Sequence, residues 1–135
     1  MPPHSKDRDV LEVVHQICRY TVAGIWAYQG LVPKLLGPHP DELAMGLAFG
    51  LSAEAARLAS FSAGTAELLF ALCLLVLHRR IWPQLVSAIA MAGLLGFVAI
   101  WAPGYLGAAF NPVVMNAAGC ALSVIAVLVL RARAA

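Results

Sequence analysis

The feature that most constrains the fold of this chain is a single carboxylate inside a long apolar run. Residues 63–77 are almost entirely apolar, and Glu67 is the one acidic side chain among them. A charged residue at the centre of a membrane-spanning helix costs roughly 2.5–3.5 kcal/mol on insertion scales, so it usually faces the bundle interior and has a partner there. We therefore expect Glu67 to point into a helix bundle, toward polar groups of other helices.

The composition places the chain among membrane proteins. Hydrophobic residues make up 61% of the 135 residues and charged residues 12%, whereas soluble domains are nearer half apolar and a quarter charged. The net charge of +2 is too small to indicate a nucleic-acid partner, and the basic residues lie at the ends of apolar runs rather than in a patch. The length allows one domain, so we expect a single transmembrane domain over residues 1–135.

Four apolar segments are each close to the roughly 20 residues that cross a hydrocarbon core about 30 Å thick. They cover about residues 10–36, 53–77, 82–102 and 112–130. Between the first two, Pro40 is followed by two acidic residues, a pattern typical of a helix start. The sequence thus predicts an all-α integral membrane bundle of four transmembrane helices, with a short interfacial helix between the first and second.

The basic residues indicate the orientation of this bundle. With four spans, both termini and the joint between the second and third spans lie on one side of the membrane. The basic residues on that side are Lys6, Arg8, Arg79, Arg80, Arg131 and Arg133. The other side has only Lys34 and Arg57. The positive-inside rule therefore predicts cytoplasmic N- and C-termini.

No motif assigns catalytic residues, and whether the chain is an enzyme stays open. Cys18, Cys73 and Cys120 form no C-x-x-C pair, which argues against a zinc knuckle or a redox dithiol. Phosphate-binding glycine loops, H-E-x-x-H and serine nucleophile elbows are also missing from the sequence. His15 and His78 lie near helix ends, where interfacial polar residues are expected. Haem ligation by this pair remains an alternative, and we expect no metal site.

Polar side chains share faces of three predicted helices, because same-face residues recur at three- and four-residue steps. On the second segment Ser60 and Gly64 share the face of Glu67, and on the fourth Asn116 shares a face with Ser123. The face of the first segment carries His15, Arg19, Trp26, Gln29 and Pro33. We expect these faces to meet inside the bundle.

Counting about 1.5 Å per residue from the cytoplasmic helix ends puts Arg19 and Glu67 at similar heights. The sharpest hypothesis is an Arg19–Glu67 pair at the floor of a cavity that opens outward. Trp26, Gln29, Asn116 and Lys34 would line its walls. Two alternatives stay open: the ion pair only fixes helix register, or Lys34 only snorkels to the headgroups. Whether Arg19 or Lys34 is the partner of Glu67 also stays open.

Three motifs resemble those of the DoxX-like family of small membrane proteins. They are W-x-Y-x-G-x-x-P-K at residues 26–34, G-x-x-E at 64–67 and N-P-x-x-x-N at 111–116. The resemblance covers the chain from residue 19 to the end of the fourth segment, and it implies a four-helix protein of the bacterial inner membrane. It also implies that Lys34, Glu67, Asn111 and Asn116 are site or signature positions.

The family takes its name from a small subunit linked to quinone-dependent sulfur oxidation, although most members have no assigned activity. The leading expectation is therefore a subunit or accessory factor with a polar intramembrane pocket for a quinone-like or other amphipathic ligand. Its pocket residues would be Arg19, Trp26, Gln29, Lys34, Glu67, Asn111 and Asn116. One alternative is a transport or proton-permeation unit for a small solute, and another is a structural scaffold subunit. The lipid bilayer, and a homo-oligomer or larger membrane complex, are the expected partners.

Overall fold

The computed structural model describes residues 5–107 and 112–134, and within these ranges the chain is helical, with no strand. This confirms the all-α prediction. A π-helical turn, η1, continues the first helix, and a 3₁₀ turn, η2, follows the fourth. The elements are α1 (Ser5–Gly30), η1 (Leu31–Leu35), α2 (Pro40–Ala48), α3 (Ala53–Val76), α4 (Trp82–Trp101), η2 (Pro103–Gly107) and α5 (Pro112–Ala134).

Three of these helices are long and apolar enough to cross a membrane: α3, α4 and residues 113–134 of α5. The 26-residue α1 is not among them, because His15, Gln16 and Arg19 interrupt its apolar residues. It also begins at Ser5 rather than at residue 10, so the mixed-charge residues before the first apolar segment are helical. By length and composition, the structure supports three of the four expected spans.

The short helix predicted between the first two segments is present as α2. The His39 side chain caps its start by accepting the Asp41 N–H at 3.3 Å, and Pro40 occupies the first turn. The Ser52 hydroxyl accepts the Ala55 N–H at 3.2 Å and caps α3 in the same way. Local capping chemistry therefore sets both boundaries.

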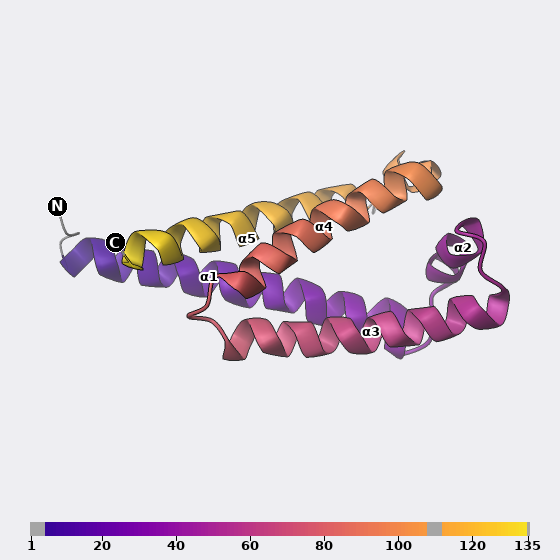
Figure 1. Cartoon of the computed structure of the whole chain (residues 1–135), viewed down its shortest axis with the longest axis horizontal. Coiled ribbons are helices and arrows are strands. Elements are labelled where there is room, and N and C mark those ends of the chain that lie inside the picture. The colour runs from indigo at the N-terminus through magenta and orange to yellow at the C-terminus, as the bar shows by residue number, and fades with distance from the viewer. Residues whose placement is uncertain (1–4, 108–111, 135) are drawn as a thin grey trace.

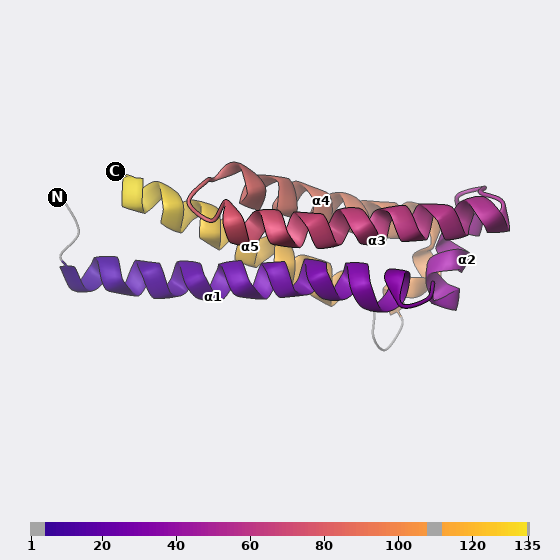
Figure 2. The same cartoon turned by 90° about the horizontal axis from the view of Figure 1, so that it is seen from below.

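The long helices form two pairs. α1 packs along α3, α4 packs along α5, and the pairs are joined by the contact between α1 and α5. α3 and α4 have few contacts with each other: they come together near the turn at residues 77–81 and separate toward their other ends (Figure 1). At that separated end α2 packs on α3 and reaches α4 (Figures 1 and 2).

The closed part of the bundle, where α3 and α4 lie close together, has an apolar core that contains one chain of hydrogen bonds, which we call the polar thread. The indole of Trp26 on α1 donates a 2.8 Å hydrogen bond to the Ser87 hydroxyl oxygen on α4. The hydroxyl of Ser123 on α5 donates to the same oxygen at 2.9 Å. Buried side chains around this thread include Val22, Ala71, Leu74 and Met91. Satisfied hydrogen bonds of this kind specify how the three helices face one another.

The closest helix crossing joins α1 and α3 through two glycines. A Cβ atom on Gly30 would lie 2.6 Å from the carbonyl oxygen of Gly64, and a Cβ on Gly64 would lie 2.7 Å from the carbonyl oxygen of Gly30. Only glycine leaves room for backbones this close, as at many helix contacts in membrane proteins. The crossing therefore fixes the register of α1 against α3.

We predict that Gly64→Ala lowers the melting temperature, because the added methyl group would overlap the Gly30 carbonyl and approach Cβ of Lys34 to 2.8 Å. Overpacking of this kind costs about 1–3 kcal/mol. The matched control is Gly93→Ala on α4, whose added Cβ meets nothing within 4 Å and which should leave the melting temperature unchanged or slightly raised. Circular dichroism during heating in detergent micelles measures both; equal melting temperatures would contradict the close crossing.

Candidate functional site

A cavity of roughly 280 Å³ lies where α3 and α4 separate, beneath α2. α1, η1, α2, α3, α4 and α5 all contribute to its wall. Its polar lining side chains are Gln29 from α1, Lys34 from η1, Glu42 from α2, Ser60 and Glu67 from α3, and Asn116 from α5. The remaining lining is largely apolar and includes Trp26 and Met91. A mostly apolar cavity with a few convergent polar groups is the usual form of a small-molecule site.

Lys34 is the centre of the polar lining. Its Nζ atom lies 3.1 Å from Oε2 of Glu67, 3.3 Å from Oε1 of Glu42 and 3.3 Å from the carbonyl oxygen of Gln29. The side chains are largely buried: Lys34 is 10% exposed, Glu67 12% and Glu42 19%. The cluster therefore joins η1, α2 and α3 through one ammonium group.

The sequence around Pro33 explains why Lys34 reaches this position. In an α-helix the carbonyl oxygen of Gln29 would accept the N–H of residue 33, but proline has no N–H. The Lys34 ammonium group instead donates a hydrogen bond to the Gln29 carbonyl oxygen. The chain then continues as the π-helical turn η1. Such turns are frequent at functional sites because they redirect side chains. Here the turn directs a lysine back into the bundle.

The glycine crossing brings Glu67 to Lys34. A Cβ on Gly30 would lie 3.0 Å from Cβ of Glu67, and a Cβ on Gly64 would lie 2.8 Å from Cβ of Lys34. Lys34 follows Gly30 by four residues and Glu67 follows Gly64 by three, so each charged side chain lies one turn beyond a glycine. Backbone contact and charge pairing thus occur in the same layer of the bundle.

Contacts of α2 with α4 and η2 close the end of the cavity. Phe49, directly after α2, packs against the rings of Phe97 at 5.6 Å and Trp101 at 5.1 Å between centroids. The Tyr105 hydroxyl donates a 3.1 Å hydrogen bond to Asp41. Desolvation, the hydrogen bond and the Asp41 charge together raise the pKa of Tyr105, so its phenol remains a donor at neutral pH.

Some polar groups that line the cavity have few partners within the described residues. Oγ of Ser60 is buried without a hydrogen bond, and Oε2 of Glu67 faces the Lys34 ammonium group at 3.1 Å. Asn116 is 7% exposed, and its side chain is on the cavity wall. Buried polar groups normally have partners, so this site has unused hydrogen-bonding capacity.

The expected Arg19–Glu67 pair is wrong. Glu67 pairs with Lys34, while the guanidinium of Arg19 lies over the ring of Tyr20, 4.5 Å from its centroid, and Arg19 does not line the cavity. Arg19 precedes Gly30, the α1 residue beside Glu67, by 11 residues, or about 16 Å of helix. The prediction assumed that the cytoplasmic ends of the first two spans lie at the same height. Instead, α1 begins earlier than the apolar segment and extends well past the C-terminal end of α3 (Figure 1).

The other site predictions divide into two groups. Asn111 lies outside the described residues. Five predicted residues line this cavity: Trp26, Gln29, Lys34, Glu67 and Asn116. Whether they hold a ligand stays a prediction. Sequence reasoning missed Glu42 as a lining residue, because an acid in a first helical turn already has an ordinary role there.

The two histidines have different surroundings. His15 is almost completely buried inside the bundle, and its expected position near the membrane interface stays a prediction. His78 contacts the carbonyl oxygen of Leu75, in the preceding turn. Within residues 5–107 and 112–134 no three His, Cys, Asp or Glu side chains come together as metal ligands would.

We predict that Lys34→Met destabilises the protein strongly, because it leaves Glu42 and Glu67 facing each other without a cation. Removing one partner of a buried ion pair costs about 3–5 kcal/mol. The double variant Lys34→Met/Glu67→Gln should be less destabilised than Lys34→Met alone. Arg57→Met, which removes an exposed cation of α3, is the control. Unfolding in detergent compares these three variants and the single variant Glu67→Gln with the wild type; strictly additive losses would contradict the coupling of Lys34 and Glu67.

Comparison with known proteins agrees with the motifs at this site. A model of the DoxX-like family matches residues 23–124, about three quarters of the chain. No curated protein and no solved structure matches it. The matched range includes Lys34, Glu42, Glu67 and Asn116. It confirms the resemblance seen in the sequence, and the chain belongs to the DoxX-like family.

Proposed function

We propose that this protein is a small subunit or accessory factor of the bacterial inner membrane that binds a quinone-like or other amphipathic ligand in the cavity beside Glu67. The observation that carries the proposal is the cavity itself: about 280 Å³, mostly apolar, with polar groups of Ser60, Glu67 and Asn116 on its wall. Such a site matches a molecule with a polar head and an apolar body. In this role Glu67 is the central acceptor and Trp26 an apolar wall.

We propose α1 as the fourth membrane span. Its exposed face carries the large hydrophobic residues Val13, Ile17, Tyr20 and Tyr28. A helix at the surface of a soluble protein has mainly polar residues on its exposed face. α1 also runs beside α3 for most of the length of α3 (Figure 2), so a membrane that contains α3 also contains α1.

The same arrangement supports cytoplasmic termini. The N- and C-terminal ends and the turn between α3 and α4 lie toward one end of the bundle (Figure 1). That end carries Arg79, Arg80, Arg131 and Arg133, and basic residues favour the cytoplasmic side. The cavity and α2 are then in the outer half of the membrane.

Two other functions are less well supported. Proton or solute permeation needs a polar path through the bundle, but Val22, Leu74 and Met91 are fully buried apolar side chains in its closed part. A scaffold without a ligand predicts a well-packed interior throughout, and the cavity beneath α2 weighs against that.

Lipid-soluble molecules that co-purify with the protein test the binding proposal. We expect mass spectrometry of organic extracts to find one amphipathic species enriched over bulk membrane lipid with the wild-type protein. Glu67→Gln and Asn116→Leu should each lose most of it, because the first replaces a charged acceptor with a neutral amide and the second removes the amide from the cavity wall. Glu54→Gln, which changes an exposed carboxylate at the start of α3, should retain it. An extract indistinguishable from bulk lipid would contradict the proposal.

The position of the N-terminus tests the fourth span. Four spans put an N-terminal epitope tag in the cytoplasm, on the same side as the C-terminus, so the tag should resist protease in intact spheroplasts. Three spans (α3, α4 and α5) would put the two termini on opposite sides. A tag at the C-terminus is the internal reference; removal of the N-terminal tag alone would contradict the proposal.

A further inference from the structure

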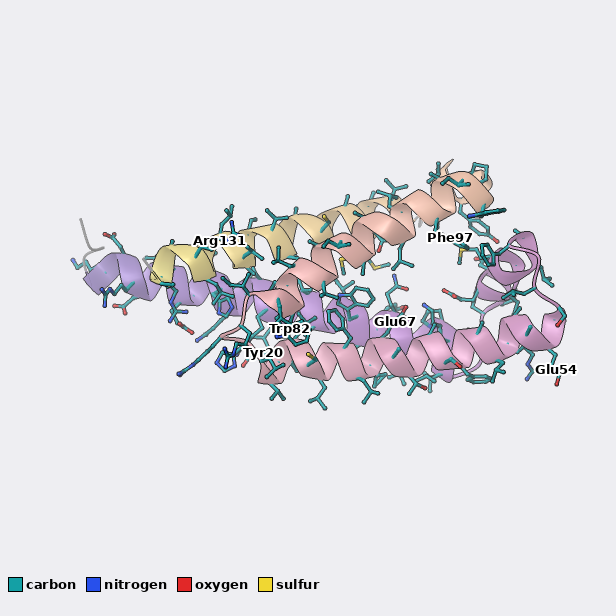
Figure 3. All side chains as sticks on the ribbon, viewed as in Figure 1. Tyr20, Glu54, Glu67, Trp82, Phe97 and Arg131 are labelled. Carbon is teal, nitrogen blue, oxygen red and sulfur yellow. The ribbon has the colours of Figure 1, made fainter. Side chains whose placement is uncertain are left out.

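Ala59 on α3 and Leu94 on α4 line the cavity, and both are exposed. α3 and α4 also have few contacts with each other. These observations indicate a side opening of the cavity between α3 and α4. Figure 3 shows Glu67 in the space between these two helices. Since α3 and α4 are both apolar spans, the surface between them faces the acyl chains of the bilayer. The opening is therefore toward lipid.

The end of the cavity toward α2 is covered, in contrast to its side. Phe49 packs on Phe97 and Trp101, and Asp41 accepts the Tyr105 hydroxyl. Figure 3 shows Phe97 on α4 facing the α2 segment. A ligand from the aqueous phase would have to displace these contacts, whereas a ligand dissolved in the bilayer would not.

The charged cluster selects the head group. An ammonium group has three donors, and the three short contacts of Lys34 supply one acceptor for each, from Glu42, Glu67 and Gln29. No donor is left over for an anion. The formal charges of the cluster are +1 for Lys34 and −1 for each glutamate, which sum to −1. The Glu67 carboxylate has more acceptor lone pairs than its one contact with Lys34 uses, so the site favours a donor and disfavours an anion.

The volume limits how much of the ligand is enclosed. Sites that bury a whole drug-sized molecule have about 300–1,000 Å³, and this cavity has roughly 280 Å³. It holds a head group and the first part of one chain. The rest of the chain must leave through the side opening between Ala59 and Leu94.

From these four observations we infer that the ligand enters from the bilayer between α3 and α4 and is a single-chain amphiphile whose head donates hydrogen bonds and carries no negative charge. This inference rests on the proposed binding function. The head lies against Glu67 and Asn116, and the chain passes Ala59 into the surrounding lipid.

Trp26 provides a reporter, because it lines the cavity and is buried from lipid. In the variant Trp82→Phe/Trp101→Phe it is the only tryptophan. The full chain is reconstituted in phosphatidylcholine vesicles and mixed with dodecyl amphiphiles brominated near the head: the amine, the alcohol and the carboxylic acid. We expect the amine and the alcohol to quench Trp26 fluorescence at about tenfold lower concentration than the acid, a difference of about 1.4 kcal/mol.

Two bulky substitutions test the route. Ala59→Phe narrows the opening and should slow the onset of quenching by the amine about tenfold. Ala66→Phe, on an exposed position of α3 away from the cavity, should leave it unchanged. Ala63→Phe, one turn along the same wall, is the second variant if Ala59→Phe folds poorly.

The outcomes separate this inference from the binding proposal. Equal onset for the Ala59 and Ala66 variants, with quenching still lost in Glu67→Gln, overturns the side route and leaves the site intact. Equal potency of the acid and the amine overturns the assignment of the head group. Quenching that Glu67→Gln does not reduce means that the amphiphiles do not occupy the cavity, and the binding proposal itself then fails.

Discussion

The ion pair between Lys34 and Glu67 is the interaction on which the rest of the bundle depends. A carboxylate within an apolar span is expensive unless a cation lies beside it. The two groups are 3.1 Å apart because Gly30 and Gly64 let α1 and α3 touch backbone to backbone one turn away. Any residue with a side chain at either glycine would separate the helices and leave the carboxylate without its counter-charge. The close packing of α1 on α3 and the pairing of Lys34 with Glu67 therefore depend on each other.

Pro33 couples this constraint to local structure. Proline removes the donor that the Gln29 carbonyl needs, and the next residue, Lys34, supplies it from its side chain. The same ammonium group holds Glu42, so a lost backbone hydrogen bond in α1 is linked to the position of α2. The position of α2 at the end of the bundle therefore depends on a buried lysine inside it.

Sequence reasoning reached much of the fold because its signals are local. The long apolar runs became α1, α3, α4 and α5, and the helix start predicted at Pro40 became α2. The apolar run around Glu67 also predicted that this carboxylate needs a buried partner. The sequence did not identify the partner, because the partner depends on helix register. Register comes from the Gly30–Gly64 crossing and from the early start of α1, neither of which shows in hydrophobic periodicity.

The side opening of the cavity could not be predicted from the sequence, for a different reason. It arises because α3 and α4 pack on different partners and separate from each other, which no single segment encodes. The same holds for Glu42. Its place in the first turn after Pro40 indicates only a helix start, and it reaches Lys34 because α2 folds back over the bundle.

The two ends of the bundle differ in how firmly they are held, and the difference suits a binding site. The closed part is held by the Trp26–Ser87–Ser123 hydrogen bonds and by fully buried apolar side chains. α2, in contrast, has no buried residue, and glycines with positive φ, Gly37 at 134° and Gly50 at 96°, lie on either side of it. α2 is instead held by contacts at its edges: the ion pair of Glu42 with Lys34, the hydrogen bond from Tyr105 to Asp41, and the packing of Phe49 on Phe97 and Trp101. The position of the cover therefore depends on the same lysine that pairs with Glu67.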